Sequence, residues 1–369
     1  MNAGTSYSRL MADTIMSRFP RADDYPYQPW SYPQGFLLWA FIRLYEKTGE
    51  QRYGDYVLDY CSRQVTPGGE VPAFTGVCLD DILPGAALVW AWTKTGDAKY
   101  KIACDRIAKA FDDYPRNSDG GFWHNRYFRH EMWVDGLFMG LMFLTRYGKY
   151  IGNQEFCFTE TVRQLSVVFD RCEKDSSGLL YHAYSEDRRA PWAHPITGKS
   201  PEVWSEGLGW YAMILADVLE LLPPNWAGYD RLAHQMEKLV NGLAKVQDGS
   251  CGLWYQVVDK PTAPRNWHDT SGSAMFLYAI KKAGLLKAAG LLGIVGIEQE
   301  RCDAIAAKAF NGLKTKCVID YEGMANIHDA CDGLGVQRSY DAYVDFSRNV
   351  NCREAVAAFF WACVIMEEV

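Results

Sequence analysis

One stretch, Gly85-Ala86-Ala87-Leu88-Val89-Trp90, shows the pattern that decides the fold: small residues lead into an aromatic, apolar segment with helical spacing. The pattern occurs six times along the chain. The other five copies begin at Gln34, Gly136, Gly209, Gly272 and Ala355. The glycines at positions 35, 85 and 136 are 50 and 51 residues apart, and the later intervals are longer, as insertions in connecting loops would make them.

Most of these apolar segments are followed by a more polar helix. In residues 97–114 and 229–247, apolar residues recur at spacings of three and four. Each repeat therefore predicts a helical hairpin, and six apolar helices bury all of their surface only if they close into a ring. The sequence predicts an all-α (α/α)6 barrel of six helical hairpins, with a single domain over residues 1–369. A linear solenoid of helix pairs is the alternative, because it has the same period.

The composition limits the partners. A chain of 369 residues that is 49% hydrophobic can bury a large core, and its net charge of -7 argues against nucleic acid or an anionic membrane as a partner. Its N-terminus lacks the features of a signal peptide, and no stretch is apolar enough to span a membrane. The eleven scattered cysteines suit a reducing compartment as unpaired thiols. We expect a cytoplasmic protein.

No sequence motif indicates a cofactor. The chain has no CxxC or HExxH motif for zinc, and no GxGxxG or P-loop motif for a dinucleotide or nucleotide. We therefore predict no metal and no cofactor. One stretch rich in glycine, alanine and leucine, residues 285–297, is predicted to be a surface or interface insertion, and no function is assigned to it.

Two aspartates precede neighbouring apolar helices. Asp80 lies in Leu79-Asp80-Asp81-Ile82, before the second repeat, and Asp135 lies in Met132-Trp133-Val134-Asp135-Gly136, before the third. In a helical barrel the starts of the inner helices gather at one mouth, so both carboxyl groups should face one cavity, as acid/base chemistry on a sugar requires. The alternative is structural, because aspartate is a preferred N-cap of helices.

Aromatic residues and two histidines surround these positions in the sequence. Trp123 and Trp254 each follow a glycine turn, and such rings stack on sugar faces, although about half of the chain's tryptophans should simply belong to the barrel core. His124 and His182 each follow an aromatic residue in a glycine turn of successive repeats. We expect both histidines at the same mouth, with solvated loop residues as the alternative.

Taken together, these motifs resemble glycoside hydrolase family 105, the unsaturated rhamnogalacturonyl hydrolases, and more distantly the unsaturated glucuronyl hydrolases. The resemblance runs from about residue 30 to residue 273, with a weaker match over residues 355–366. The segments that carry it are residues 30–35, 79–82, 120–124, 132–136, 193–195, 200–204, 209–213 and 252–257. Their joint order and spacing make the resemblance specific.

The resemblance implies roles for individual residues. It makes Asp135 the catalytic acid/base and Asp80 its partner, which would raise the pKa of Asp135 by like-charge proximity. The residues expected to bind substrate are Tyr32, Trp123, His124, Trp133, His182, Trp204, Glu206 and Trp254. The implied reaction hydrates the C4=C5 bond of a 4,5-unsaturated uronic acid, which is then released from the end of a small pectin- or rhamnogalacturonan-derived oligosaccharide.

Two positions depart from the family pattern. Glu206 stands where many members have arginine, so the substrate carboxylate or the next sugar must be held differently. The cations considered for this role are Arg188, Arg189, Lys199 and Arg265. Asp269 stands near the position where a glutamate is more usual.

Two other functions remain open at this stage. A sugar epimerase or isomerase on the same barrel would use His124 and His182 as paired bases, but it would leave Asp80 and Asp135 without a role. A carbohydrate-binding protein with a decayed site is suggested by Glu206 alone. The sequence predicts neither the sugar that follows the uronic acid nor the oligomeric state.

Overall fold

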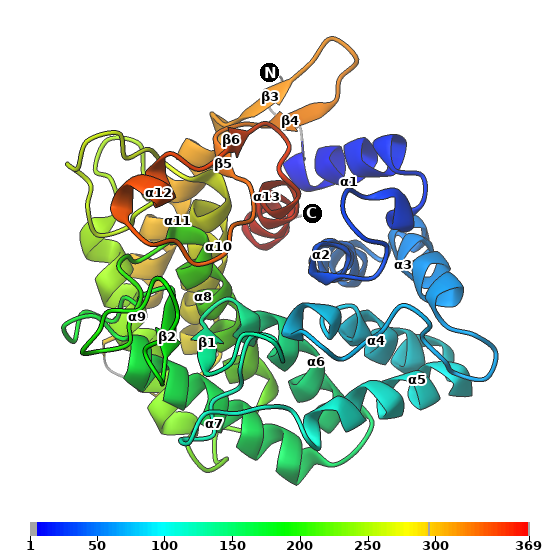
Figure 1. Ribbon diagram of the computed structural model, residues 1–369. Helices are drawn as coiled ribbons and strands as arrows, with labels where there is room; N and C mark the ends of the chain where they lie inside the picture. The colour runs from blue at the N-terminus through cyan, green and yellow to red at the C-terminus, as the bar shows by residue number, and fades with distance from the viewer. Residues whose placement is uncertain (1–5, 294–295, 368–369) are drawn as a thin grey trace.

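Six inner helices form a closed ring in the computed structural model, which describes residues 6–293 and 296–367. Each inner helix contacts the next one, and the last contacts the first, so the ring is a barrel and not a linear solenoid (Figure 1). The inner helices are α2 (Tyr32–Thr48), α4 (Gly85–Thr95), α6 (Gly136–Tyr150), α8 (Ser205–Leu221), α10 (Thr270–Ala288) and α13 (Arg353–Met366). The predicted (α/α)6 barrel is confirmed.

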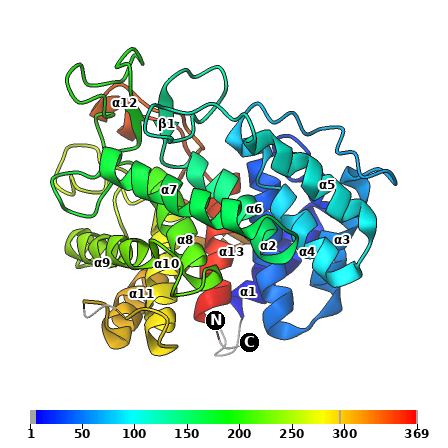
Figure 2. The same cartoon turned by 90° about the horizontal axis from the view of Figure 1, so that it is seen from below.

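An outer helix packs against each inner helix. The outer helices are α3 (Gln51–Gln64), α5 (Ala98–Ala108), α7 (Gln154–Cys172), α9 (Tyr229–Val246), α11 (Gln299–Lys314) and α1 (Tyr7–Arg18). The sixth pair joins the two ends of the chain, because α1 packs against α13 (Figure 2). Glu367 fastens this pair by accepting hydrogen bonds from the backbone N–H groups of Tyr7 (2.6 Å) and Ser8 (2.9 Å), at the positive end of α1.

Aromatic rings fill the axis of the barrel. The Phe36 ring lies 4.4 Å from the Trp210 ring and 5.5 Å from both the Phe138 and Trp361 rings, centroid to centroid. All four side chains are buried, and the Trp361 indole N–H donates to the Phe36 carbonyl (2.9 Å). This packing closes the centre of the barrel.

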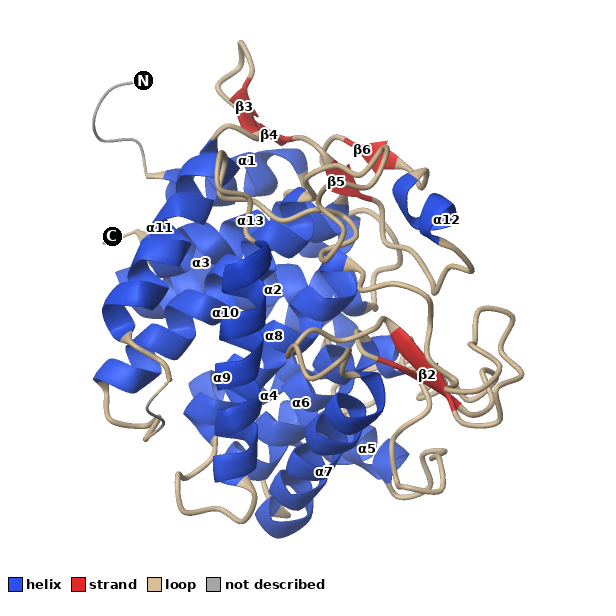
Figure 3. Cartoon of the chain, turned by 90° about the vertical axis from the view of Figure 1, so that its left-hand side faces the viewer, coloured by secondary structure: helices blue, strands red, loops and turns tan. Residues whose placement is uncertain are grey.

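Short strands and long loops collect on one side of the helical body (Figure 3). The strands pair antiparallel as β1 (Glu131–Trp133) with β2 (Ala183–Ser185), β3 (Cys317–Ile319) with β4 (Ala325–Ile327), and β5 (Ala330–Cys331) with β6 (Arg348–Asn349). The short helices are α12 (Tyr340–Val344) and the 3-10 turns η1 (Ala22–Asp24), η2 (Leu79–Asp81) and η3 (Lys109–Phe111).

The helices predicted over residues 97–114 and 229–247 correspond to α5 with η3 and to α9. The insertion predicted over residues 285–297 is wrong at its start, because residues 285–288 complete α10; residues 294 and 295 lie outside the described part. All eleven cysteines are unpaired, as predicted. Within the described residues, none of the helices combines the length and the apolar character that a membrane crossing needs.

Candidate active site

The N-terminal ends of the inner helices surround a pocket of about 200 Å³. Helix N-termini carry partial positive charge, so the first turns of α2, α6, α8 and α13, which contribute lining residues, favour an anionic ligand. The pocket is lined by Tyr27, Tyr32, Asp80, His124, Trp133, Asp135, Met139, Trp204, Glu206, Trp210, Gly333, Leu334, Gly335 and Arg353.

Asp135 lies at the start of α6, but its carboxyl group makes no hydrogen bond that caps the helix. Its side chain is 14% exposed, and its Oδ1 atom is buried without a hydrogen-bond partner in the described residues. Burial raises the pKa of Asp135 to about 6, with a smaller contribution from the Asp80 charge and an opposing one from His124. The expected cause, like-charge proximity to Asp80, is therefore secondary to burial.

His182 lies next to Asp135 and is fully buried. Its Nδ1 atom is 2.9 Å from the Tyr343 hydroxyl, which accepts a hydrogen bond from the backbone N–H of Gln337 (3.3 Å). The other ring nitrogen, Nε2, is buried without a hydrogen-bond partner in the described residues and lies 3.8 Å from Asp135 Oδ1. Burial lowers the pKa of His182 to about 3, helped by the charge of His124, so His182 is neutral at pH 7.

His124 lies between the carboxyl group of Asp80 and the ring of Trp133. Its Nε2 atom is 3.8 Å from Asp80 Oδ2, and its ring stacks on Trp133 with centroids 4.3 Å apart and planes 8° apart. The glycine at position 136 makes this arrangement possible, because a Cβ atom there would lie 2.6 Å from His124 Nδ1. The motif that ends in Asp135-Gly136 therefore serves the site twice, with a carboxyl group and with space for the imidazole.

A buried acid, Glu206, lines the pocket, and Glu354 lies next to it beside Tyr32. Glu206 is 1% exposed and accepts a hydrogen bond from the Ser271 hydroxyl (2.8 Å). Burial, together with the charges of Glu354 and Asp269, raises the pKa of Glu206 well above its usual value. Glu354 accepts a hydrogen bond from the Tyr32 hydroxyl (2.5 Å).

Arg353 is the first residue of α13. Among the residues that line this pocket, it is the side chain with a permanent positive charge. Its Nε atom is 2.8 Å from Glu354 Oε1, and its guanidinium lies 4.6 Å from the centre of the Tyr27 ring. The side chain is 20% exposed, so part of it can reach a ligand.

A family model, Glycosyl Hydrolase Family 88, matches residues 7–369. The chain belongs to glycosyl hydrolase family 88. A family 105 glycoside hydrolase from C. acetobutylicum ATCC 824 is 29% identical, with a TM-score of 0.89 over 98% of this chain and 99% of that one. The curated Protein Atu3128 of Agrobacterium fabrum is 36% identical over 190 residues, which are 51% of this chain and 78% of that protein. An unsaturated glucuronyl hydrolase from Bacillus sp. GL1, at 16% identity and a TM-score of 0.69 over 98% and 95% of the two chains, shares the fold.

The predicted resemblance to family 105 and to the unsaturated glucuronyl hydrolases is confirmed, because the chain matches the family 88 model and solved structures of both kinds are similar to it. The structure brings most of the predicted site residues together. The predicted residues that line the pocket are Asp80, Asp135, Tyr32, His124, Trp133, Trp204 and Glu206. His182 adjoins the pocket through its approach to Asp135.

Two predicted tryptophans lie elsewhere in the family 88 barrel. Trp254 is completely buried; its indole N–H donates to the Leu243 carbonyl (2.9 Å), and its ring packs against Phe276 in the core. Its assignment as a substrate contact is therefore wrong. Trp123 is outside the pocket lining, and its indole N–H donates to Asn117 Oδ1 (2.9 Å).

The cations proposed from the sequence are also outside the pocket lining. Arg265 pairs with Asp341 and Asp345, and Lys199 donates to the Glu173 carbonyl (2.6 Å). Arg353 lines the pocket instead, and its place two residues before the last apolar repeat, which begins at Ala355, was the available signal.

Folding also creates two side-chain groups that the sequence spacing did not reveal. Each combines a thiol, a carboxylate and an imidazole whose ligand atoms lie within 4.8 Å of one another. The groups are Cys78, Asp80 and His124 at the pocket, and Asp248, Cys251 and His268 in the loop before α10. Such ligands bind zinc well.

Proposed function

We propose that this family 88 protein releases a 4,5-unsaturated uronic acid from the non-reducing end of a small oligosaccharide by hydrating the C4=C5 bond. The observation that carries the proposal is Asp135, whose pKa of about 6 keeps a fraction of its carboxyl groups protonated near neutral pH. The Asp135 side chain lines the pocket and is 14% exposed, so its carboxyl group can reach a substrate.

The first step is protonation of the alkene. Asp135 donates its proton to C4, and the positive charge that develops at C5 is shared with the ring oxygen. Asp80 stabilises this charge as a carboxylate, and it reaches the pocket from the turn before α4. His182 Nε2 lies 3.8 Å from Oδ1 of Asp135, and the tautomer with its proton on Nε2 would stabilise the carboxylate that forms.

The second step is the addition of water. The Asp135 carboxylate accepts a proton from a water molecule, whose oxygen bonds to C5 and gives a hemiketal. The hemiketal opens by breaking the bond between C5 and the ring oxygen, which leaves a ketone at C5 and a hemiacetal at C1. The hemiacetal then expels the following sugar as an alcohol, and Asp135 is again protonated.

Arg353 holds the substrate carboxylate in this proposal. The sequence expected that role to pass to another cation because of Glu206, and Arg353 is a lining residue on the same pocket. Burial raises the pKa of Glu206 well above its usual value, which favours the neutral form and weakens the repulsion of a bound carboxylate. The small volume of the pocket suits one sugar ring and thus cleavage at the chain end.

The two alternative functions have weaker support. An epimerase would need His182 as a base, but its Nδ1 atom is engaged by Tyr343 and its pKa is low. A decayed binding protein was suggested by Glu206, yet Asp80 and Asp135 both line the pocket with their carboxyl groups.

The test follows the ultraviolet absorbance of the double bond in a set of unsaturated disaccharides that differ only in the second sugar. Loss of absorbance at equal enzyme concentration is expected, and Arg353→Gln should raise KM by about tenfold or more because it removes a charged hydrogen-bond donor. Arg189→Gln is the matched control, since this side chain is 88% exposed and outside the pocket lining. An unchanged absorbance with every disaccharide would refute the proposed function.

A further inference from the structure

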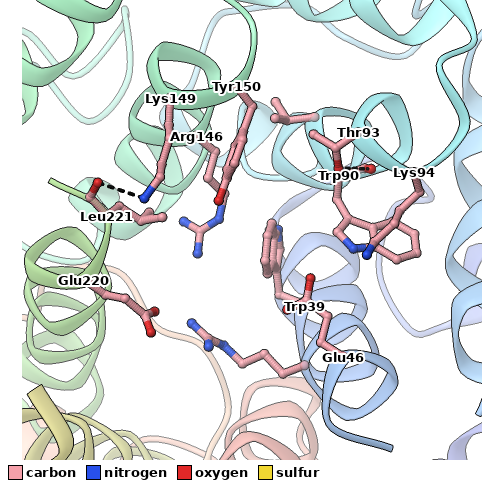
Figure 4. A pocket seen from close by; sticks show the side chains of 12 residues that line it. Trp39, Glu46, Trp90, Thr93, Lys94, Arg146, Lys149, Tyr150, Glu220 and Leu221 are labelled. Atoms are coloured by element: carbon pink, nitrogen blue, oxygen red, sulfur yellow. Dashed lines mark hydrogen bonds between the residues drawn. The ribbon is translucent and has the colours of Figure 1, made fainter. Parts of the chain in front are cut away.

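A cavity at the C-terminal ends of α2, α4, α6 and α8 has a volume of about 420 Å³, but three of its cations already have partners within the protein (Figure 4). Arg43 and Arg146 pair with the buried carboxylate of Asp217 at 2.7 and 2.6 Å. Lys149 donates to the Leu221 carbonyl (3.0 Å), the contact drawn as a dashed line in Figure 4. These contacts join the ends of the inner helices to one another.

The loop between α9 and α10, residues 247–269, brings together the side chains of Asp248, Cys251 and His268. Their ligand atoms lie within 4.8 Å of one another. Nε2 of His268 is 2.9 Å from Oδ2 of Asp248 and 3.6 Å from Sγ of Cys251. One nitrogen can share a proton with the carboxylate or with the thiol, so a hydrogen bond accounts for only one of these two approaches. A cation between the three atoms accounts for both.

Backbone hydrogen bonds fix the positions of all three residues. The N–H of Gly252 donates to the Asp248 carbonyl (2.9 Å), and this bond closes the turn that carries Cys251. His268 pairs with Tyr255 in an antiparallel bridge on the other side of the loop. The three side chains therefore extend from ordered backbone, and a ligand bound between them requires no rearrangement of the chain.

Neighbouring polar groups orient the ligand atoms. Oδ1 of Asp248 accepts hydrogen bonds from the backbone N–H (2.7 Å) and the hydroxyl (2.6 Å) of Ser250, so Oδ2 is the oxygen that faces His268. The Tyr255 hydroxyl donates to Oδ2 (2.9 Å), and the Tyr255 ring packs on the His268 ring with centroids 4.1 Å apart. Carboxylates that bind metals are typically held by such outer hydrogen bonds.

The distances between the ligand atoms fit zinc. In a tetrahedral site with Zn–N and Zn–O bonds of about 2.0–2.1 Å and a Zn–S bond of about 2.3 Å, the nitrogen lies about 3.3 Å from the oxygen and about 3.6 Å from the sulfur. The observed 2.9 and 3.6 Å require Oδ2 of Asp248 to move by about 0.4 Å. Thiolate and imidazole favour zinc over magnesium and calcium, which prefer oxygen ligands. The His268 side chain is 25% exposed, so an ion can enter from solvent.

We propose that Asp248, Cys251 and His268 bind one Zn²⁺ ion, with water as the fourth ligand. The Cys251 thiol releases its proton to solvent, and His268 coordinates through the Nε2 lone pair with its proton on Nδ1. The ion joins the end of α9 to the start of α10, because His268 directly precedes Asp269, whose side chain caps α10 by accepting from the Gly272 N–H (2.8 Å).

The proposed zinc site is independent of the proposed reaction, because none of its three residues lines the candidate active site. The sequence predicted no metal because it has no CxxC or HExxH motif. Cys251 and His268 are 17 residues apart, a spacing that neither motif covers. Folding of the loop brings the two side chains together.

The test uses the full chain with the substitution Cys78→Ser, which removes the thiol of the other group, after treatment with a chelator. Calorimetric titration with zinc should find one site per chain with a Kd of about 1 µM or lower. Excess zinc should raise Tm by about 5 °C, and magnesium should not. Cobalt(II) should give the charge-transfer absorbance of a metal-bound thiolate.

Further substitutions in this chain identify the ligands. Cys251→Ser should remove the cobalt absorbance and weaken zinc binding about 100-fold or more, and His268→Gln should weaken zinc binding to a similar extent. Tyr255→Phe removes only the outer hydrogen bond to Asp248 and should weaken binding about tenfold. Cys317→Ser, at a buried cysteine outside both groups, is the matched control and should change neither measurement.

The inference is overturned if zinc does not bind at this affinity, or if cobalt(II) gives no thiolate absorbance. It is also overturned if zinc binding survives both Cys251→Ser and His268→Gln, because the ion then lies elsewhere on the chain. If Cys251→Ser does not fold, His268→Gln and Tyr255→Phe decide the result.

Discussion

Replacing Asp135 by asparagine should reduce activity and at the same time stabilise the protein above pH 6. The pKa of Asp135 is about 6 in the folded chain, against about 3.9 in an unfolded one. The folded state therefore binds more protons than the unfolded state between these values, and wild-type stability falls as pH rises through this window. Two units of pKa correspond to about 3 kcal/mol. Asparagine does not ionise, so the variant lacks this loss.

The assay is urea unfolding of wild type and Asp135→Asn at intervals from pH 4 to pH 8. The stability difference between them should change by about 3 kcal/mol in favour of the variant across this range and level off above pH 7. Activity should fall roughly 10²–10⁴-fold, the usual cost of losing a general acid. Asp112→Asn, at an exposed position, is the control for both measurements. A pH-independent stability difference, or near-normal turnover, would refute the reasoning.

Two further predictions concern the surroundings of Asp135. The pKa of Glu206 is raised in the folded chain, so the wild type loses stability as pH rises through that pKa. Glu206→Gln should therefore melt at a higher temperature than the wild type at alkaline pH, and the difference in Tm should shrink as pH falls. A difference in Tm that stays constant from pH 5 to pH 9 would contradict this. Zinc should inhibit turnover reversibly by binding Cys78, Asp80 and His124. Cys78→Ser should weaken this inhibition, and Cys251→Ser, in the other group, should not. Equal sensitivity of both variants to zinc would exclude the Cys78 site.

The barrel was predictable because its inner helices must be apolar on nearly every face. In α8, for example, buried residues occur all round the helix, and this leaves a repeat in the sequence that outer loops of varying length do not hide. The outer helix of the sixth pair, α1, was less visible in the sequence. No apolar repeat precedes residue 30, and the contact that fixes α1 depends on Glu367 at the other end of the chain.

The acidic pair was predictable from position, since a residue directly before an inner helix must lie at the mouth. The direction in which a side chain points was not predictable from its position. Trp123 and Trp254 follow similar glycine turns, but the indole of Trp254 turns into the core, where the Leu243 carbonyl accepts its hydrogen bond. Arg353 was missed because its approach to the pocket depends on ring closure, which brings the last repeat beside the first.

Hydrolysis in D2O of an unsaturated disaccharide, with a saturated uronide of the same linkage as a parallel substrate, tests the central claim most directly. Hydration requires the double bond and delivers a solvent-derived proton to C4. We predict one deuterium at C4 of the released sugar, found by NMR, and no cleavage of the saturated uronide. Cleavage of both substrates at comparable rates without deuterium at C4 would instead indicate ordinary glycoside hydrolysis by the two carboxylates and would contradict the account.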